Sequence, residues 1–187
     1  MSMHEWQTGR LLVATPALED PNFERTVVLI LDHDEDGALG VVLNRTSDLA
    51  VDEALAGWTD LVASPPVVFG GGPVEPTAIV ALGRATASVP ADEGVSPRLD
   101  RVRLVDLGAD PVLAAADLDH VRVFAGYAGW GPGQLELEVD AGAWFTIDAE
   151  PADVFTPDPS RLWQAVLRRQ PDELALFSTF PADPSLN

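Results

Sequence analysis

Short apolar runs separated by polar turns dominate this chain of 187 residues. Runs of about four to eight residues that are rich in β-branched side chains are typical of strands buried on both faces. The runs predict strands at residues 9–15, 26–31, 38–44, 67–69, 77–82, 102–107, 121–125 and 144–147. The second and third runs flank a short acidic turn that ends in Asp36-Gly37, which indicates a β-hairpin.

Apolar residues at helical spacing predict four helices. They cover residues 51–57, 111–116, 134–139 and a last stretch from Pro159 up to Pro171, with candidate N-caps at Ser47 or Asp48, at Asp110 and at Asp158. The third stretch also alternates like a strand. Pro132 before it and Gly142 after it favour the helix. Leu135 and Val139 are spaced as on one helical face.

Length and composition suit one domain that spans residues 1–187. Hydrophobic residues make up 47% of the chain, enough for a core, and no linker divides it. We expect residues 181–187 to fray. The sequence has neither an apolar run as long as a membrane span nor the pattern of a signal peptide. A cytoplasmic protein without membrane contact is therefore expected.

The absence of cysteine and lysine removes several kinds of chemistry, since all 11 basic residues are arginine. Disulfides, thiolate nucleophiles, thiolate zinc sites and iron–sulfur clusters are excluded. Schiff-base chemistry and a P-loop lysine are excluded as well. The formal net charge of −19 repels phosphates, so binding to nucleic acid is not expected.

Glycines and aromatic residues alternate between residues 124 and 136, and a glycine triplet at 70–72 follows another apolar run. The first stretch predicts a strand to residue 125, then a glycine loop, then a helix that opens near Pro132. Main-chain amides at such a helix start can cradle an anion. The alternative is that the glycines only give packing room to the rings. The candidate ligand-binding residues are Gly70, Gly71, Gly72, Gly126, Tyr127, Gly129, Trp130, Gly131, Gly133 and Gln134.

The acidic residues do not form a recognisable catalytic or metal-binding set. The stretch 32–37 begins like a calcium loop, but the twelfth position of that pattern is Leu43 instead of a glutamate, so a solvated turn is expected. His33 within the turn is interpreted as a lone surface histidine. Glu136 and Glu138 lie two residues apart and do not share a helix face. We predict no catalytic residue, no metal and no cofactor.

Four stretches of the chain together form a specific sequence pattern. They are residues 9–16 with 20–23, 37–45, 69–74 and 126–135. This combination resembles the YqgE/AlgH family of bacterial proteins over most of the chain. The resemblance implies a single α/β domain of α+β character, with a mixed, strongly curved or barrel-like sheet packed by helices. The triplet at 70–72 departs from the glycine pair of the family.

Three hypotheses of function remain open, because the family is largely uncharacterised and supplies no established catalytic residue. The favoured one is a non-enzymatic binding or regulatory module that takes a small anionic ligand or a protein partner. The second is a hydrolytic enzyme that uses carboxylates, with or without a metal. The third is DNA-linked regulation, from the label of transcriptional regulator that some members carry, but the sequence shows no helix-turn-helix signature. The oligomeric state is left open.

Overall fold

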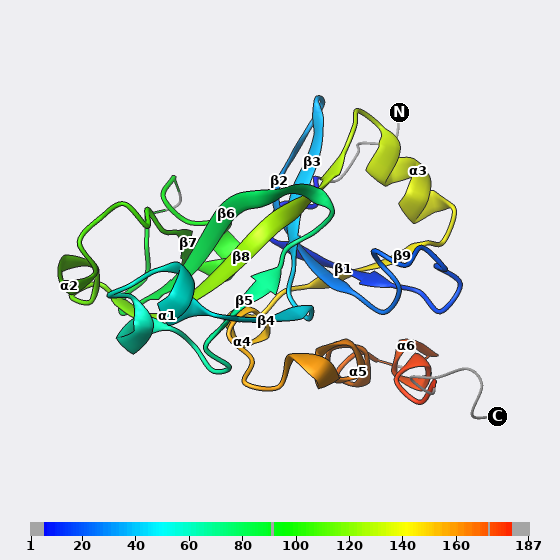
Figure 1. Cartoon of the computed structure of the whole chain (residues 1–187). Helices are drawn as coiled ribbons and strands as arrows, with labels where there is room; N and C mark the ends of the chain where they lie inside the picture. Colours follow the sequence, from blue (N-terminus) through cyan, green and yellow to red (C-terminus); the bar gives the residue numbers. More distant parts are fainter. Residues whose placement is uncertain (1–5, 91, 172, 181–187) are drawn as a thin grey trace.

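A computed structural model describes residues 6–90, 92–171 and 173–180 (Figure 1). Its strands are β1 (Arg10–Ala14), β2 (Val27–Asp34), β3 (Gly37–Val42), β4 (Thr46–Ala50), β5 (Val67–Gly70), β6 (Val74–Ala85), β7 (Val102–Leu104), β8 (Leu118–Trp130) and β9 (Trp144–Asp148). Its α-helices are α1 (Val51–Ala54), α2 (Pro111–Ala114), α3 (Gln134–Asp140), α4 (Pro151–Val154), α5 (Leu162–Arg168) and α6 (Glu173–Phe177). The predicted frayed tail at 181–187 lies outside the described residues.

The strands form one mixed sheet around the long strand β8. The main path has the order β4-β5-β8-β3-β2-β1-β9, and β6 and β7 branch from β8. β5 runs parallel to β8, with Phe69 opposite Phe124, while β3 and β6 run antiparallel to it. The mixed sheet in a single domain is confirmed, and the sheet is not closed into a barrel.

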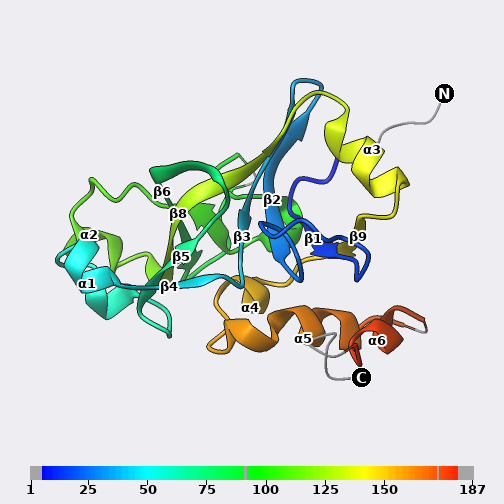
Figure 2. The ribbon, with the colours of Figure 1, turned by 45° about the vertical axis from the view of Figure 1, so that its right-hand side comes forward.

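Both faces of the sheet are largely buried at β1, β2 and β3, which explains why these apolar runs are continuous. Successive residues of a strand point to opposite faces, so Leu11 belongs to one core and Leu12 to another. The core on one face includes residues from α4 and α5, and Figure 2 shows these helices together on one side of the sheet. The other face carries two separate cores, one beneath α3 and one beneath α1 and α2.

Strand β8 is longer than the sequence predicts. It continues to Trp130, so the predicted glycine loop is wrong between residues 126 and 130. Glycine weakens an isolated strand. Here the pairing of Ala128 with Gly40 and of Trp130 with Ala38 keeps the chain extended against β3.

The four predicted helices are confirmed in position, but not all of their predicted N-cap residues are correct. The Asp110 side chain caps α2 by accepting the N–H of Val112 at 2.9 Å. The predicted caps Ser47 and Asp48 are wrong, because both residues lie in the unpredicted strand β4. The hydroxyl of Ser47 donates instead to the carbonyl of Val68 in β5, at 2.7 Å.

The last part of the chain differs in detail from the prediction. Pro159 begins a 3-10 turn that leads into α5, and the side chain of Asp158 makes no cap hydrogen bond to it. Helices α4 and α6 were not predicted, since each is too short to show a helical period. A reciprocal capping box between Glu150 and Asp153 starts α4.

Candidate functional site

The two predicted glycine segments meet, and they meet main chain against main chain. The N–H of Gly71 donates to the carbonyl of Ala125 at 2.8 Å, and the carbonyl of Gly71 accepts the N–H of Val42 at 2.8 Å. A Cβ atom on Gly71 would lie 2.2 Å from the carbonyl oxygen of Gly126, and one on Gly72 would lie 2.3 Å from that of Tyr127. Close backbone approach therefore explains these glycines without a ligand.

The predicted Trp130 and Gln134 belong to a hydrogen-bond network centred on Glu138. One carboxylate oxygen of Glu138 accepts the indole N–H of Trp130 at 3.0 Å and that of Trp144 at 2.8 Å. The other oxygen accepts the side-chain amide of Gln134 at 2.9 Å, and Gln134 in turn accepts the N–H of Gly131 at 3.0 Å. Glu138 thus ties α3 to the end of β8 and to β9.

Tyr127, Gly129 and Gly133 lie in three different places. Tyr127 packs against the core that holds α5, on the side of the sheet away from α3. Gly129 is an exposed residue of β8. Gly133 has a left-handed backbone with φ 71°, immediately before α3, and it lines a cavity. Of the predicted residues, Gly133 is the one that leads to the site described next.

A cleft lies between α3 and the tip of the β2–β3 hairpin, and we call it the α3 cleft. Its volume is about 490 Å³, and it is lined by Trp6, Asp34, Glu35, Gly133, Glu136, Leu137 and Asp140. Four of the lining residues are acidic and none is basic. Trp6 is 48% exposed and Leu137 is 72% exposed. Apolar walls and carboxylates therefore meet in one depression.

His33 and Glu136 form a fixed pair beside this cleft. The His33 side chain is only 2% exposed, so the predicted surface histidine is wrong. Its Nδ1 accepts the N–H of Gln7 at 3.1 Å, which leaves the ring proton on Nε2. That Nε2 lies 3.2 Å from Oε1 of Glu136. The other oxygen of Glu136 is buried and has no hydrogen-bond partner among the described residues.

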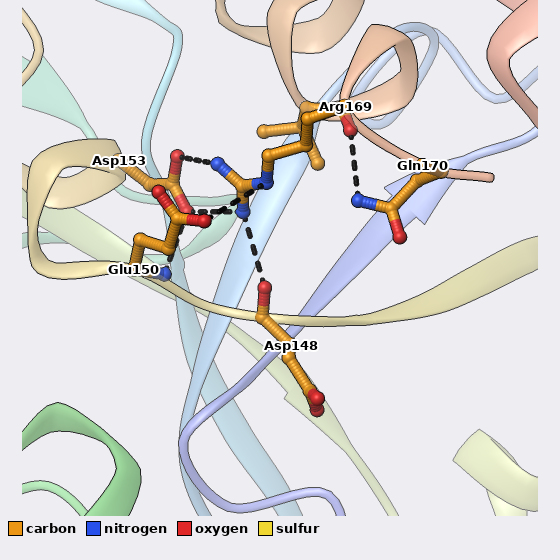
Figure 3. Close-up of polar contacts among 6 residues, drawn as sticks. Asp148, Glu150, Asp153, Arg169 and Gln170 are labelled. Atoms are coloured by element: carbon orange, nitrogen blue, oxygen red, sulfur yellow. Dashed lines mark hydrogen bonds and ion pairs between the residues drawn. The ribbon is translucent and has the colours of Figure 1, made fainter.

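A second cavity, of about 350 Å³, is lined by Arg10, Thr146, Ile147, Asp148, Glu150, Arg169 and Gln170. Figure 3 shows that Arg169 is the centre of its polar contacts. The guanidinium of Arg169 donates to both oxygens of Asp153, at 2.5 and 2.7 Å, and to the carbonyl of Asp148 at 3.1 Å. Hydrogen bonding to Asp153 raises the pKa of Arg169. The guanidinium N–H groups of Arg169 therefore join α5 to α4 and β9. Because these donors are already used within the protein, the cavity is a weak candidate for an anion site.

A buried arginine, Arg122, interrupts the apolar run of β8 and was missed by the sequence analysis. It is 1% exposed and donates to the carbonyls of Thr156 at 2.9 Å and Ser64 at 2.6 Å. Its guanidinium lies 4.3 Å from the ring centre of Phe69. Burial lowers the pKa of Arg122 to about 10. The sequence signal that could have identified it is a single arginine inside an apolar strand. Its two hydrogen bonds join the segments at Ser64 and Thr156 to strand β8.

The acidic hairpin turn forms as the sequence predicts, with Asp34 ending β2 and accepting the N–H of Asp36 at 2.9 Å. Within residues 6–90, 92–171 and 173–180, no group of three or more histidine or carboxylate side chains is arranged to hold a metal ion. No helix in the same residues is long and apolar enough to cross a membrane.

Comparison with known proteins agrees with the motifs. A family model described as AlgH-like matches residues 11–175. A UPF0301 protein of Streptomyces avermitilis is 56% identical over 185 residues, which cover 96% of this chain and 95% of the relative.

Two solved structures share the fold. The crystal structure of protein DIP2367 from Corynebacterium diphtheriae has a TM-score of 0.86 and 38% identity, and the match covers 96% of this chain and 95% of that one. The solution structure of the AlgH protein from Pseudomonas aeruginosa has a TM-score of 0.65 and 28% identity, with 98% of both chains covered. The resemblance drawn from the motifs is confirmed, and the chain belongs to the AlgH-like family, whose curated members carry the name UPF0301.

Proposed function

We propose that this protein is a non-enzymatic binding module, that its ligand site is the α3 cleft, and that its ligand presents a cationic group on an apolar stem. The sequence favoured a small anionic ligand or a protein partner. An anion in this cleft would meet Asp34, Glu35, Glu136 and Asp140 without a basic lining residue. A free organic cation, or an arginine or lysine side chain of a protein partner, has the complementary charge.

The observation that carries the proposal is the unpaired oxygen of Glu136. Its Oε2 is buried without a hydrogen-bond partner among the described residues, while Oε1 faces His33. An unsatisfied buried acceptor costs about 1–3 kcal/mol, and more when it is charged. The Glu136 side chain is 23% exposed and lines the cleft, so a turn of its carboxylate brings Oε2 within reach of a guanidinium or ammonium N–H, which supplies the missing bond with opposite charge.

The two apolar residues of the cleft supply the rest of the recognition. The Trp6 ring packs edge-on against His33, with ring centres 5.0 Å apart, and this contact holds the indole beside the Glu136 pair. A cation over an indole face gains about 0.5–2 kcal/mol. Leu137 is exposed on the same cleft and offers a surface for an alkyl stem.

The test compares two ligands that share one stem. In heteronuclear NMR titrations, n-butylguanidinium should shift the indole signal of Trp6 and the amides of residues 133–140, and pentanoate should not. Glu136→Gln should weaken the guanidinium response by about tenfold or more, as expected for loss of a charged hydrogen bond. Glu53→Gln, on the exposed surface of α1, is the matched control. Equal responses to both ligands, or an unchanged Glu136→Gln variant, would sink the proposal.

A hydrolytic enzyme is the second candidate, and the His33–Glu136 pair is the observation that favours it. A carboxylate oriented by a histidine can act as a general base. His33 itself is too buried to touch a substrate, whereas the Glu136 side chain is 23% exposed, so Glu136 would be the reacting group. A screen with phosphate and carboxylate esters separates the candidates: turnover that Glu136→Gln abolishes favours the enzyme, while cation binding without turnover favours the module.

DNA-linked regulation is the least supported candidate. The net charge of −19 opposes the phosphate contacts on which such binding depends. We expect no specific retention on DNA at physiological salt, and a salt-sensitive shift of DNA mobility would contradict this expectation.

A further inference from the structure

One face of α3 carries two carboxylates with an exposed leucine between them. Glu136, Leu137 and Asp140 have the spacing of a single helix face, and all three line the α3 cleft. Leu135 lies on the other side of the helix, where it is 1% exposed and belongs to the core. Glu136 and Asp140 are therefore about one helical turn apart along the wall of the cleft, which is a rise of about 6 Å.

These two carboxylates are unfavourably placed for the helix itself. Like charges four residues apart on a helix repel each other. Asp140 is also the last residue of α3, where the helix dipole disfavours an anion, and α3 contains no basic residue. Neither the Asp140 carboxylate nor Oε2 of Glu136 makes a hydrogen bond or an ion pair with another described residue. A cation that contacts both carboxylates removes the repulsion between them.

The separation of the two carboxylates determines which cation fits both of them. Two ammonium groups joined by four methylene groups are separated by five bonds of about 1.5 Å, so the extended chain places the nitrogens roughly 6 Å apart. One ammonium group then meets Glu136 and the other meets Asp140, each in a charge-assisted hydrogen bond. The methylene groups lie along Leu137, which is 72% exposed. Asp34 and Glu35, on the hairpin side of the cleft, add to the negative potential.

We propose that the α3 cleft binds an aliphatic diamine, whose two ammonium groups are joined by a chain of four or five carbon atoms. This inference rests on the cation-binding function proposed for the same cleft, and it names the class of ligand. A free diamine is favoured over a lysine or arginine side chain of a partner, because such a side chain carries a single positive charge. Asp140 is the residue that gives specificity for the second charge.

The test compares ligands in NMR titrations of the full-length protein near neutral pH. Putrescine and n-butylammonium share a four-carbon chain, and putrescine has a second ammonium group. The amides of residues 133–140 and the indole signal of Trp6 should give a dissociation constant at least about tenfold lower for putrescine. Nα-acetyl-lysine methylamide, which represents a lysine within a protein, should bind no more tightly than n-butylammonium.

Two variants locate the second charge. Asp140→Asn should reduce the preference for putrescine over n-butylammonium to less than about threefold, because each ligand then has one carboxylate partner on α3. Asp52→Asn makes the same change at an exposed position of α1, far from α3 (Figure 1), and should keep the tenfold preference. Asp140 and Asp52 are both exposed, so both variants should remain folded, which circular dichroism checks.

The outcomes separate this inference from the function on which it rests. If n-butylammonium and n-butylguanidinium bind while putrescine binds no more tightly, the diamine assignment is overturned and the cation site stands. A tenfold preference that Asp140→Asn retains also overturns the assignment, because the second ammonium group would then lie elsewhere. If none of the three cations shifts the signals of residues 133–140, both proposals fail.

Discussion

The indole N–H of Trp144 donates to Glu138 at 2.8 Å, and the same carboxylate oxygen also accepts the indole N–H of Trp130. Both tryptophans are buried, at 3% and 6% exposure. Glu138→Ala leaves two buried N–H groups without an acceptor, and we expect a loss of about 2–4 kcal/mol in the free energy of unfolding. Glu138→Gln keeps an acceptor oxygen and should lose less. Urea denaturation followed by tryptophan fluorescence measures both, and equal losses would contradict this account of Glu138.

Two adjacent glycines should respond differently to the same substitution. A Cβ at Gly71 would lie 2.2 Å from the carbonyl oxygen of Gly126, whereas a Cβ at Gly70 would meet nothing closer than 3.8 Å. Gly71→Ala must move main chain and should destabilise the protein by about 2 kcal/mol or more. Gly70→Ala should stay within about 1 kcal/mol of the wild type. Thermal and urea denaturation of the two variants decide the matter; similar stabilities would show that the close approach is not structurally important.

Removal of Arg169 should destabilise the joint between α4, α5 and β9. The side chain of Asp153 is 5% exposed and its charge is balanced by Arg169, which is itself 27% exposed. Arg169→Met leaves a buried carboxylate without its cation. We expect a loss of about 2–4 kcal/mol in the free energy of unfolding, which is no more than is lost when a fully buried ion pair is broken. The neighbour Arg168 makes a matched control, because Arg168→Met removes an exposed charge and should change stability by less than about 0.5 kcal/mol. Losses of similar size in the two variants would contradict the assigned role.

His120 should make stability depend on pH. Burial first, and then the charge of Arg84, lower the pKa of His120 below its ordinary value of 6.5, and its Nδ1 lies 2.7 Å from a nitrogen of Arg84. Between the lowered pKa and 6.5 the unfolded chain binds more protons than the folded one, so acid favours unfolding. The contribution of neutral His120 to the free energy of unfolding is complete above pH 6.5 and is lost as the pH falls through the lowered pKa. The measurement is the free energy of unfolding of the wild type and of His120→Asn between about pH 5 and pH 7. The wild type should gain stability relative to the variant as the pH rises, and parallel curves would count against the shift.

The fold was more predictable from the sequence than the candidate site, for physical reasons. Runs such as 26–31 predicted strands correctly, because burial on both faces leaves a continuous apolar signal. Strand β4 carried no such signal, since all but one of its residues are exposed and it pairs only with β5. The extension of β8 past Gly126 depends on its pairing with β3. The intrinsic strand propensity of these residues does not reveal that pairing.

The α3 cleft could not be predicted because its parts are distant in the sequence. His33 and Glu136 lie 3.2 Å apart in space but belong to the β2–β3 hairpin and to α3. The sequence analysis weighed each residue singly and interpreted His33 as exposed. The glycine segments were the more visible pattern, yet their contacts are mainly those of packing. Gly133 alone connected that pattern to the cleft.

Strand β8 pairs with β3, β5 and β6, so the two halves of the sheet cannot be joined until β8 is available up to residue 130. During synthesis on the ribosome, the first hundred or so residues therefore emerge without the strand that joins their two halves. The β2–β3 hairpin can form early because its contacts are local. The parallel pairing of β5 with β8 spans more than fifty residues, from Phe69 to Phe124, and must form late. The nascent chain consequently carries unpaired apolar strands over much of its translation, and such strands favour aggregation until β8 has been made.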